Sequence, residues 1–302
     1  MFRTTPILTQ SRISTSLKRV RTARIKVKGW FSALALVAVL SASCGFTAHA
    51  TSAASVATPS LSPPVRCPGC WHPARKTSWQ WQLQGTIHQS LNVVMYDVDM
   101  FDTPASVVAS LHKVRRIVIC YIDAGTWESW RPDANKFPNS VKGNSVSGFS
   151  NERWLDIRQQ SILDPIMKAR MDLCKSKGFK GVEFDNVDGY TNNTGFPLTA
   201  SEQLSYNVFL ANAAHTRGLS VALKNDLDQV MTLLPYFDWA LDEQCFQYRE
   251  CNKLVSFIKA NKAVMEVEYN LSTSQFCPKA NAMNFNAMKK HFSLDAYRVA
   301  CR

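Results

Sequence analysis

Residues 181–190, with the sequence GVEFDNVDGY, begin as a β-strand and end as a polar loop. The valines and the phenylalanine favour a strand, but three carboxylates and an asparagine within six positions are more polar groups than a buried strand ordinarily carries. Upstream, residues 164–177 have the apolar spacing of an amphipathic helix, and Gly178 is placed to end it. This order of helix, turn and strand is the repeating step of a parallel sheet.

Ligands bind at the carboxyl ends of the strands in such sheets. We therefore expect the polar residues that follow the strand to belong to a site, although a simple cap on the next helix is the alternative for any one of them. These residues are Asp185, Asn186 and Asp188.

Strand-like and helical runs alternate through the rest of the chain. Strands are expected at residues 79–84, 93–98, 116–123, 181–186, 219–225, 239–244, 263–269 and 296–300, and helices at residues 104–113, 164–177, 201–217, 228–234, 254–261 and 284–291. Eight strands with intervening helices predict the α/β class, as a single (β/α)8 TIM-type barrel. A doubly wound open sheet is the alternative, but no glycine-rich phosphate loop follows the first strand.

Alternate residues of a barrel strand point inward, so the inward direction of Asp185 predicts those of its neighbours. Six further polar side chains are expected at the same mouth, namely Asp97, Tyr121, Asp123, Lys224, Glu243 and Glu268. Their apolar neighbours should face the helices, as at Val94, Val118, Ile122, Phe184 and Val267. Lys224 is expected to keep a neighbouring carboxylate ionised, or to form a buried ion pair with Glu183.

The first 78 residues have a different composition. Residues 1–50 combine eight basic side chains with an apolar run and the ending Ala48-His49-Ala50, which is typical of a secretory signal cleaved after Ala50. Cys44 permits a lipoprotein anchor as the alternative. Residues 51–78 are rich in Ser, Ala, Thr and Pro and are expected to form a flexible linker before the barrel domain at residues 79–302. The mature protein is expected to be extracellular or periplasmic and monomeric, with membrane contact only through an uncleaved signal.

The formal net charge of +12 does not indicate nucleic-acid binding. Eight basic residues lie in the signal and three more in the linker, and neither segment contains an acidic residue, so residues 79–302 carry a charge of about +1. The folded domain has no basic excess, and a nucleic-acid partner is not expected.

Eight cysteines follow the signal, an even number that favours disulfides in an exported protein. The pair Cys245 and Cys251 is separated by a short loop and is the first expected disulfide. Cys277 with Cys301 and Cys120 with Cys174 are further expected pairs. Cys67 and Cys70 have no second pair of matching spacing, so a local disulfide or a variable tail is favoured over a zinc site.

Three functions are compatible with an acidic mouth. Paired carboxylates perform glycoside hydrolysis, and aromatic residues near strand ends could stack on sugar rings, among them Trp127, Trp79, Trp81, Trp130 and Tyr190. A metal-dependent phosphodiesterase is the second possibility, although no histidine stands at an expected strand end. A sugar-binding barrel without catalysis is the third. We expect neither a metal ion nor another cofactor.

Several separated motifs resemble one family in their order along the chain. These are VMYDVDMFD (94–102), EFDNVDGYTN (183–192), residues 207–218, LKND (223–226), EQCFQY (243–248) and EVEY (266–269). Together they are similar to the endo-α-1,4-polygalactosaminidases of glycoside hydrolase family 114, and the resemblance covers residues 79–270. It implies a secreted barrel that acts on galactosamine-containing polysaccharide, with Asp185 and Glu243 as the catalytic pair. Asp185 is then the expected nucleophile and Glu243 the expected general acid and base.

Overall fold

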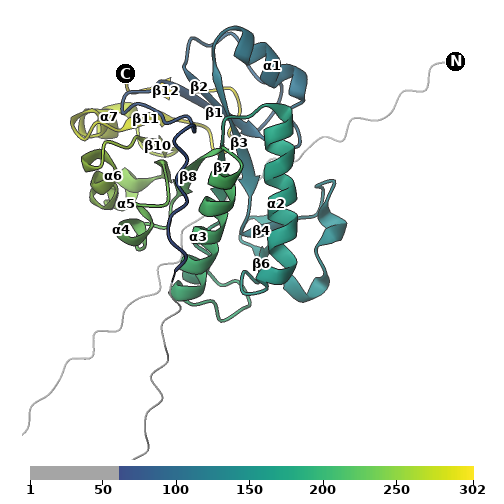
Figure 1. The fold of residues 1–302 in the computed structure, drawn as a ribbon. Helices are drawn as coiled ribbons and strands as arrows, with labels where there is room; N and C mark the ends of the chain where they lie inside the picture. The colour runs from purple at the N-terminus through teal and green to yellow at the C-terminus, as the bar shows by residue number, and fades with distance from the viewer. Residues whose placement is uncertain (1–60) are drawn as a thin grey trace, which may run out of the picture. The chain divides into compact units, whose positions relative to one another are not determined.

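The computed structural model describes residues 61–302, which Figure 1 shows as a coloured ribbon. The predicted signal peptide, its cleavage after Ala50, the alternative anchor at Cys44 and residues 51–60 of the predicted linker lie outside the described residues.

A nine-stranded sheet forms the centre of the domain, in the order β1-β2-β3-β7-β8-β9-β10-β11-β12. The first eight of these strands are parallel, and β12 is antiparallel to β11. The strands are β1 (Trp79–Gln82), β2 (Met95–Asp99), β3 (Ile117–Asp123), β7 (Gly181–Asp185), β8 (Ser220–Lys224), β9 (Trp239–Glu243), β10 (Val264–Glu268), β11 (Asn286–Lys289) and β12 (Val299–Ala300).

A small antiparallel sheet, in the order β4-β6-β5, is inserted after β3. It consists of β4 (Thr126–Glu128), β5 (Lys142–Val146) and β6 (Phe149–Leu155), preceded by the short 3-10 turns η1 (Ala134–Lys136) and η2 (Asn139–Val141). This region had been expected only as a long loop. The insertion follows the carboxyl end of a parallel strand, so it belongs to the edge of the main sheet where a site is expected.

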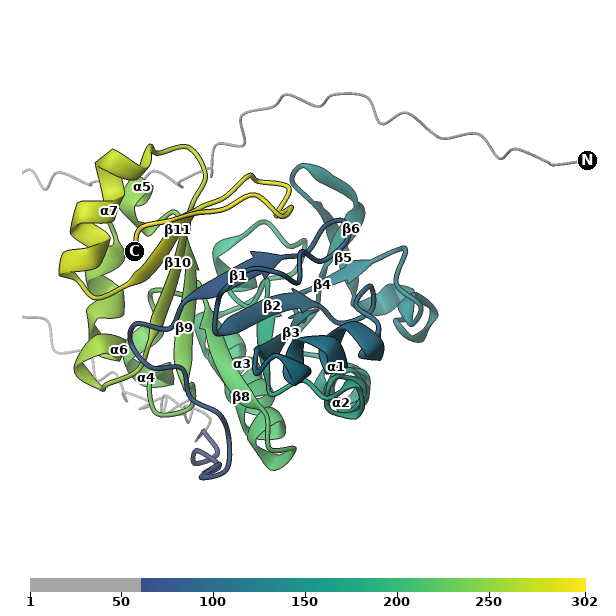
Figure 2. The ribbon, with the colours of Figure 1, turned by 90° about the horizontal axis from the view of Figure 1, so that it is seen from above.

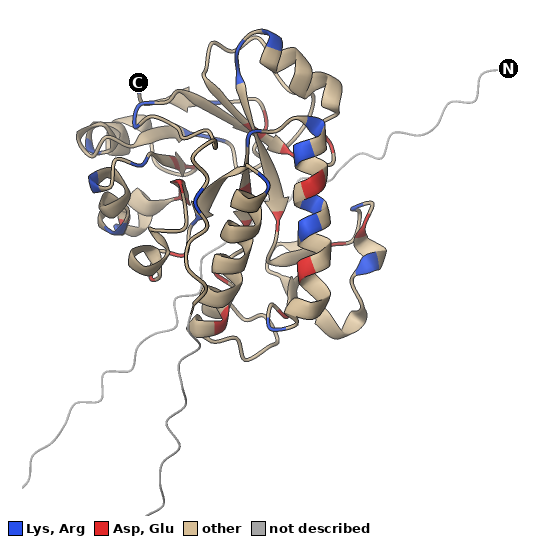
Figure 3. Ribbon diagram, in the orientation of Figure 1, with Lys and Arg blue, Asp and Glu red and all other residues tan. Residues whose placement is uncertain are grey.

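Helices connect most of the parallel strands and lie outside the curved sheet (Figure 2). They are α1 (Ala105–Lys113), α2 (Gln160–Lys177), α3 (Ala200–Thr216), α4 (Val230–Leu233), α5 (Cys245–Tyr248), α6 (Val255–Lys259) and α7 (Thr273–Ala282), with 3-10 turns η3 (Gly189–Thr191) and η4 (Cys251–Leu254). Gly178 ends α2 with a φ of 96°, as expected for a glycine stop. Thr199 and Glu202 form a capping box at the start of α3. Both acidic and basic residues lie along α2 (Figure 3).

Seven of the eight expected strands occur within about two residues of their predicted ends, but the C-terminal predictions are wrong. Residues 284–291 were expected as a helix, whereas they contain the eighth parallel strand, β11. The expected strand at residues 296–300 contains only the short antiparallel β12. The physical reason is long-range pairing: Asn284 turns the chain away from α7 with a φ of 59°, and Asn286–Lys289 then form a parallel ladder with β10.

The C-terminal segment contacts both ends of the main sheet. It pairs with β11 through β12, and the backbone N–H of Leu83 donates to the carbonyl of Leu294 at 2.9 Å. The indole of Trp79 also donates to the carbonyl of Asn286 at 2.8 Å. Within residues 61–302, β1 and β11 share no ladder. The fold is therefore α/β with a curled sheet and eight parallel strands, without the regular closure that the barrel prediction implied.

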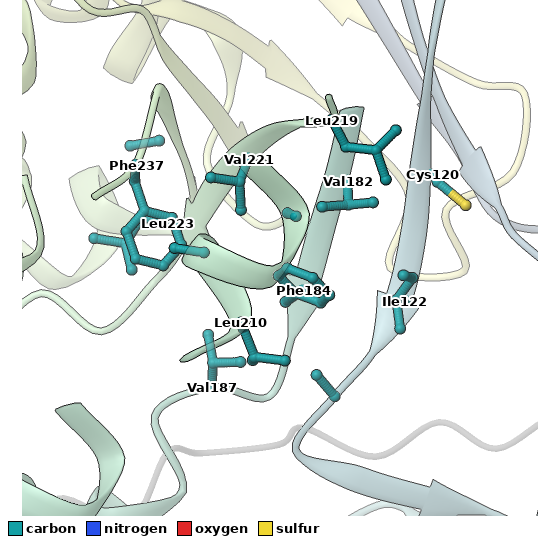
Figure 4. Close-up of a cluster of buried hydrophobic side chains, with 14 of the residues drawn as sticks. Cys120, Ile122, Val182, Phe184, Val187, Leu210, Leu219, Val221, Leu223 and Phe237 are labelled. Atoms are coloured by element: carbon teal, nitrogen blue, oxygen red, sulfur yellow. The ribbon is translucent and has the colours of Figure 1, made fainter. Parts of the chain in front are cut away.

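Strand alternation divides the apolar side chains into two layers. One cluster lies inside the curve of the sheet and includes Trp79, Trp81, Trp239, Met265 and Met288. The other lies between the sheet and the helices, and Figure 4 shows part of it, including Val182, Phe184, Leu210, Val221 and Phe237. Trp79 and Trp81, which were candidates for sugar stacking, are instead buried in the inner layer.

Residues 61–78 pack against the domain, although they fall in the segment expected to be a flexible linker. The hydroxyl of Tyr236 donates to the carbonyl of Ser62 at 2.8 Å, and the side chain of Asn212 bonds the backbone of both Pro63 and Val65. Since these bonds hold several backbone groups, this part of the chain belongs structurally to the domain. No helix within residues 61–302 is both long and apolar enough to cross a membrane.

All four expected disulfides are present, namely Cys67–Cys70, Cys120–Cys174, Cys245–Cys251 and Cys277–Cys301. Cys120–Cys174 spans 54 residues and joins β3 to α2. Both of its cysteines are fully buried in the outer apolar layer. This disulfide therefore constrains the largest loop of the four.

We predict that the double substitution Cys120→Ala and Cys174→Ala lowers the free energy of unfolding by about 4 kcal/mol, because loop-closure entropy grows with the number of residues enclosed. The matched double substitution at Cys67 and Cys70 closes a much shorter loop and should cost only about 2 kcal/mol. Urea unfolding of both variants measures the two losses. Equal losses would contradict this ranking.

Candidate active site

The side chain of Lys224 lies at the centre of the acidic mouth, at the carboxyl end of β8. Its Nζ donates to Asp185 Oδ1 at 2.6 Å and lies 2.9 Å from Glu243 Oε2 and 3.6 Å from Glu183 Oε1. The side chain is only 1% exposed. An unpaired ammonium is costly to bury, but here three carboxylates surround it and raise its pKa well above the usual value despite the opposing effect of burial. Lys224 thus remains a fixed cation.

Asp185 ends β7 and is held by three donors. Besides Lys224, the hydroxyl of Tyr121 donates to Oδ2 at 2.8 Å, and the backbone N–H of Asn186 donates to Oδ1 at 2.8 Å. Burial by itself would raise the pKa of Asp185, but Lys224 and the other two donors outweigh it and lower the pKa below the usual value. The carboxylate is therefore ionised at neutral pH.

Glu243 ends β9 beside Asp185. The hydroxyl of Tyr269 donates to its Oε1, while Oε2 faces Lys224. Because one oxygen of each carboxylate contacts the same Nζ atom at 2.6 and 2.9 Å, the two oxygens are at most about 5.5 Å apart. Both side chains remain partly exposed, 19% for Asp185 and 23% for Glu243. They are the parts of this cluster that a substrate can reach.

Asp97 and Glu183 lie beneath this pair and are fully buried. Burial raises the pKa of Asp97 to about 8, although the nearby Glu183 and Lys224 oppose that rise. Burial and the nearby Asp97 also raise the pKa of Glu183 well above its usual value. Two adjacent carboxyl groups in a low-dielectric site retain a proton between them. Asp97 was expected to contact substrate, but its burial places it in the floor of the site instead.

Asp123 also belongs to the supporting structure. It accepts hydrogen bonds from the backbone N–H and the hydroxyl of Thr126 and, at 2.9 Å, from the side-chain amide of Asn186. Asn186 takes a left-handed φ of 59°, and its carbonyl approaches Gly125 so closely that a Cβ there would lie 1.7 Å from the oxygen. These contacts fix the loop that follows Asp185. Asp123 is therefore buried, while Asn186 remains partly exposed.

The prediction that Glu268 faces the mouth is wrong. Val267 lies in the inner apolar layer, so Glu268 points outward, where its Oε1 accepts backbone N–H groups of Phe246 at 2.9 Å and Gln247 at 3.0 Å. The predicted directions of Val267 and Glu268 were reversed. On β10 the inward-facing side chains are Val267 and, two residues later, Tyr269. The expectation for Val94 also fails, since that side chain is exposed.

Two other expected site residues, Trp127 and Asp188, interact with residues outside the carboxylate pair. The indole of Trp127 donates to the carbonyl of Ala134 at 3.0 Å, and Lys142 Nζ lies 4.1 Å from its ring. Asp188 directly precedes η3. Burial raises the pKa of Asp226 to about 8, and the nearby charge of Asp188 contributes to this rise.

Two residues of the mouth, Tyr269 and Glu152, were not predicted from the sequence. Tyr269 lies one position beyond β10 on the inward side, a direction that correct alternation would have predicted. Glu152 lies on β6 opposite Glu128, in the insertion that had no strand prediction. Burial, Glu128 and Asp185 together raise the pKa of Glu152 to about 8. Its field therefore reaches the catalytic candidates from the inserted sheet.

Arg131 connects the insertion to the main sheet through buried hydrogen bonds. Its guanidinium donates to both oxygens of Glu128, at 2.6 and 2.8 Å, and to Asp99 at 2.6 Å. A bidentate, buried contact of this kind fixes both position and direction. Within residues 61–302, no group of three or more His, Cys, Asp and Glu side chains has the arrangement of a metal site.

A family model and several solved structures match most of this chain. The model of glycoside-hydrolase family GH114 matches residues 62–302. The chain is similar to Aspergillus fumigatus Ega3, whose structure was solved in complex with galactosamine, with 35% identity and a TM-score of 0.75 over 80% of this chain and 100% of that one. It also resembles the glycoside hydrolase domain of PelA from Pseudomonas aeruginosa, at 10% identity and a TM-score of 0.59, over 76% of this chain and 99% of that one, a likeness of fold. No curated protein matches.

The buried pair Asp97 and Glu183 generates a prediction on stability and pH. A carboxyl whose pKa is raised in the folded state binds more protons there than in the unfolded chain, so its contribution to stability is lost as pH rises from about 4 to about 8. Asp97→Asn removes up to one of the protons that the folded state binds in excess. The free energy of unfolding should therefore fall less steeply with pH, by up to about 1.4 kcal/mol per pH unit. Urea unfolding between pH 4 and 8 measures it, with the exposed Asp228→Asn as control. Parallel curves for the wild type and Asp97→Asn would refute the assignment.

Proposed function

The chain belongs to glycoside-hydrolase family GH114, and we propose that it hydrolyses an α-1,4-linked galactosamine polymer with Asp185 and Glu243 as its two catalytic carboxylates. The observation that carries this proposal is the shared contact of both carboxylates with Lys224, which keeps their nearest oxygens within about 5.5 Å. Retaining glycosidases have carboxyl groups about 5–5.5 Å apart, whereas inverting enzymes leave about 6.5–9.5 Å for a water molecule. We infer a retaining mechanism, which requires the closer of these two arrangements, because both carboxylates contact one ammonium group.

In the first step, Asp185 attacks the anomeric carbon while the bond to the leaving oxygen breaks and Glu243 gives that oxygen its proton. In the second step, Glu243 takes a proton from water, the water oxygen attacks the same carbon, and the Asp185 carboxylate is released. Lys224 and Tyr121 hold Asp185 ionised and oriented. Tyr269 orients Glu243 from the opposite side.

The charge of the mouth favours a cationic sugar. Galactosamine carries an ammonium group, and carboxylates in a cleft concentrate and bind such a group by charge-assisted hydrogen bonds. Glu152 is suited to this contact because it is partly exposed and makes no hydrogen bond or ion pair within residues 61–302. Tyr121, Asn186 and Asp188 are further candidates for substrate contacts. The similarity to Ega3, solved with galactosamine, supports the same substrate class.

The finer points of fold and location also belong to this proposal. We infer that the domain is a (β/α)8 barrel in which the C-terminal segment replaces a regular closure, a view supported by the eight parallel strands in order. The protein acts outside the cytoplasm as a monomer, after removal of the predicted signal. Four disulfides support an oxidising compartment.

We predict that Asp185→Asn and Glu243→Gln affect the two steps differently. Asp185→Asn removes the nucleophile and should reduce hydrolysis of both polymer and an activated aryl glycoside by at least about 1,000-fold. Glu243→Gln removes the proton donor and should impair formation of the glycosyl-enzyme much less for the aryl glycoside, whose leaving group needs no proton. Burst kinetics with the aryl glycoside and reducing-end release from the polymer measure both effects.

The control for this experiment is Asp172→Asn, which changes an exposed carboxylate on α2 and should leave both rates unchanged. Circular dichroism and melting curves establish that each variant is folded. Retention of more than a few per cent of the polymer rate by folded Asp185→Asn protein would exclude this residue as the nucleophile.

A chelator separates the glycosidase from the alternative phosphodiesterase. Because the proposed steps use only carboxylates and water, we predict full activity on the galactosamine polymer after dialysis against EDTA. Loss of activity that Mg²⁺ or Ca²⁺ restores would favour the metal-dependent alternative. Polymer binding by the wild-type protein without release of reducing ends would favour the non-catalytic binding barrel.

A further inference from the structure

An aromatic row leads outward from the proposed acid and base. Tyr269, whose hydroxyl bonds Glu243, contacts Phe292 edge to face, with ring centroids 5.4 Å apart. Phe292 in turn contacts Phe149, with centroids 6.1 Å apart. The three rings come from three separate chain segments. They connect the catalytic centre with the tip of the inserted sheet.

All three rings lie at the carboxyl-terminal edge of the main sheet. Tyr269 directly follows β10, Phe292 lies in the loop after β11, and Phe149 begins β6 in the insertion after β3. Figure 2 shows the yellow loop after β11 extending toward the teal insertion. The contact between Phe292 and Phe149 thus brings together loops from strands that lie well apart in the sheet order.

The outer two rings remain open to solvent. Phe292 is 56% exposed and Phe149 is 41% exposed, although they contact each other. A contact made only for packing would be expected to remove more of these rings from water, since burial provides its stabilisation. An exposed pair of aromatic faces beside a catalytic centre is the form of a ligand-binding surface.

The charge around this surface fits one occupant. The inserted sheet that carries Phe149 also carries Glu152, whose side chain is partly exposed and whose carboxyl group an approaching ammonium would convert to the ionised form. An aromatic face attracts a cation, and a nearby carboxylate binds it. An aminosugar presents both an apolar ring face and an ammonium group, so it matches this combination better than a neutral sugar does.

We propose that Phe292 and Phe149 form a binding surface for galactosamine units of the polymer beyond those at the catalytic pair, where their rings stack on the sugars. This inference rests on the proposed function and specifies how the same site holds a long substrate. Tyr269 joins the surface to the reacting bond. The protein then discriminates polymer from short substrates through KM rather than through the chemical step.

The test compares a polymer with a substrate too short to reach the surface. Phe292→Ala and Phe149→Ala should each raise KM for an α-1,4-galactosamine polymer about three- to tenfold, while kcat and KM for the aryl glycoside of galactosamine stay unchanged. Phe292→Leu keeps an apolar side chain against Tyr269 but removes the ring, and should raise the polymer KM similarly. Val114→Ala changes an exposed apolar side chain just before β3, at the opposite edge of the sheet, and is the control.

Three outcomes would overturn the inference. One is an unchanged polymer KM in Phe292→Ala and Phe149→Ala. Another is an equal fall of kcat on both substrates, which would indicate that the rings only position Tyr269. A third is full recovery of polymer KM in Phe292→Leu, which would indicate apolar packing instead of stacking.

The binding surface can also be tested apart from catalysis. Polymer binding to Asp185→Asn protein should weaken by the same three- to tenfold factor when Phe292→Ala is added, as measured by calorimetry. If the wild-type protein released no reducing ends, the proposed hydrolysis would fail, and this binding measurement would still decide the role of the two rings. Unchanged binding in the double variant would refute that role.

Discussion

The buried ammonium of Lys224 is the contact on which the acidic site depends. Asp185, Glu243 and Glu183 come from two strands that flank β8, and like charges so close together would repel strongly in a poorly solvated interior. One cation contacts all three. Loss of one partner from a buried ion pair commonly costs about 3–5 kcal/mol. The contact that holds Asp185 and Glu243 close together therefore also contributes to the stability of the sheet.

Protonation of buried carboxyl groups also reduces the negative charge in the floor of the site. Asp185 remains ionised, whereas the deeper Asp97 and Glu183 have raised pKa values and hold a proton between them. Neighbouring carboxyl groups thus differ because donors surround one and burial isolates the others. On the helix-facing side of β10, burial raises the pKa values of both Glu266 and Glu268. A cluster of acidic residues in the sequence therefore predicts a site only when the side chains are known to point to the same face of the sheet.

The inserted sheet adds Glu152 and Phe149 to the edge of the main sheet where the candidate site lies. Its position depends on Arg131, which links Glu128 on β4 to Asp99 at the end of β2. Arg170 adds a second connection, because it donates to the carbonyl of Asp123 and pairs with Asp133 in the insertion. Through these buried contacts, Glu152 and Phe149 are held by the same framework that holds the reactive carboxylates. A loop insertion can therefore act as a rigid part of the site.

The sequence by itself determined the α/β class and seven strand positions, because strand alternation and helix stops are properties of neighbouring residues. It also suggested the disulfide pairs, and its resemblance to one family implied the candidate pair Asp185 and Glu243. Only the tertiary structure decided the direction of Glu268, the burial of Asp97 and the identity of β11. Each of these depends on a one-residue phase or on contacts between distant segments. Tyr269, Phe292 and Phe149 are far apart in the chain, so their alignment exists only once the strands have brought their loops to one edge.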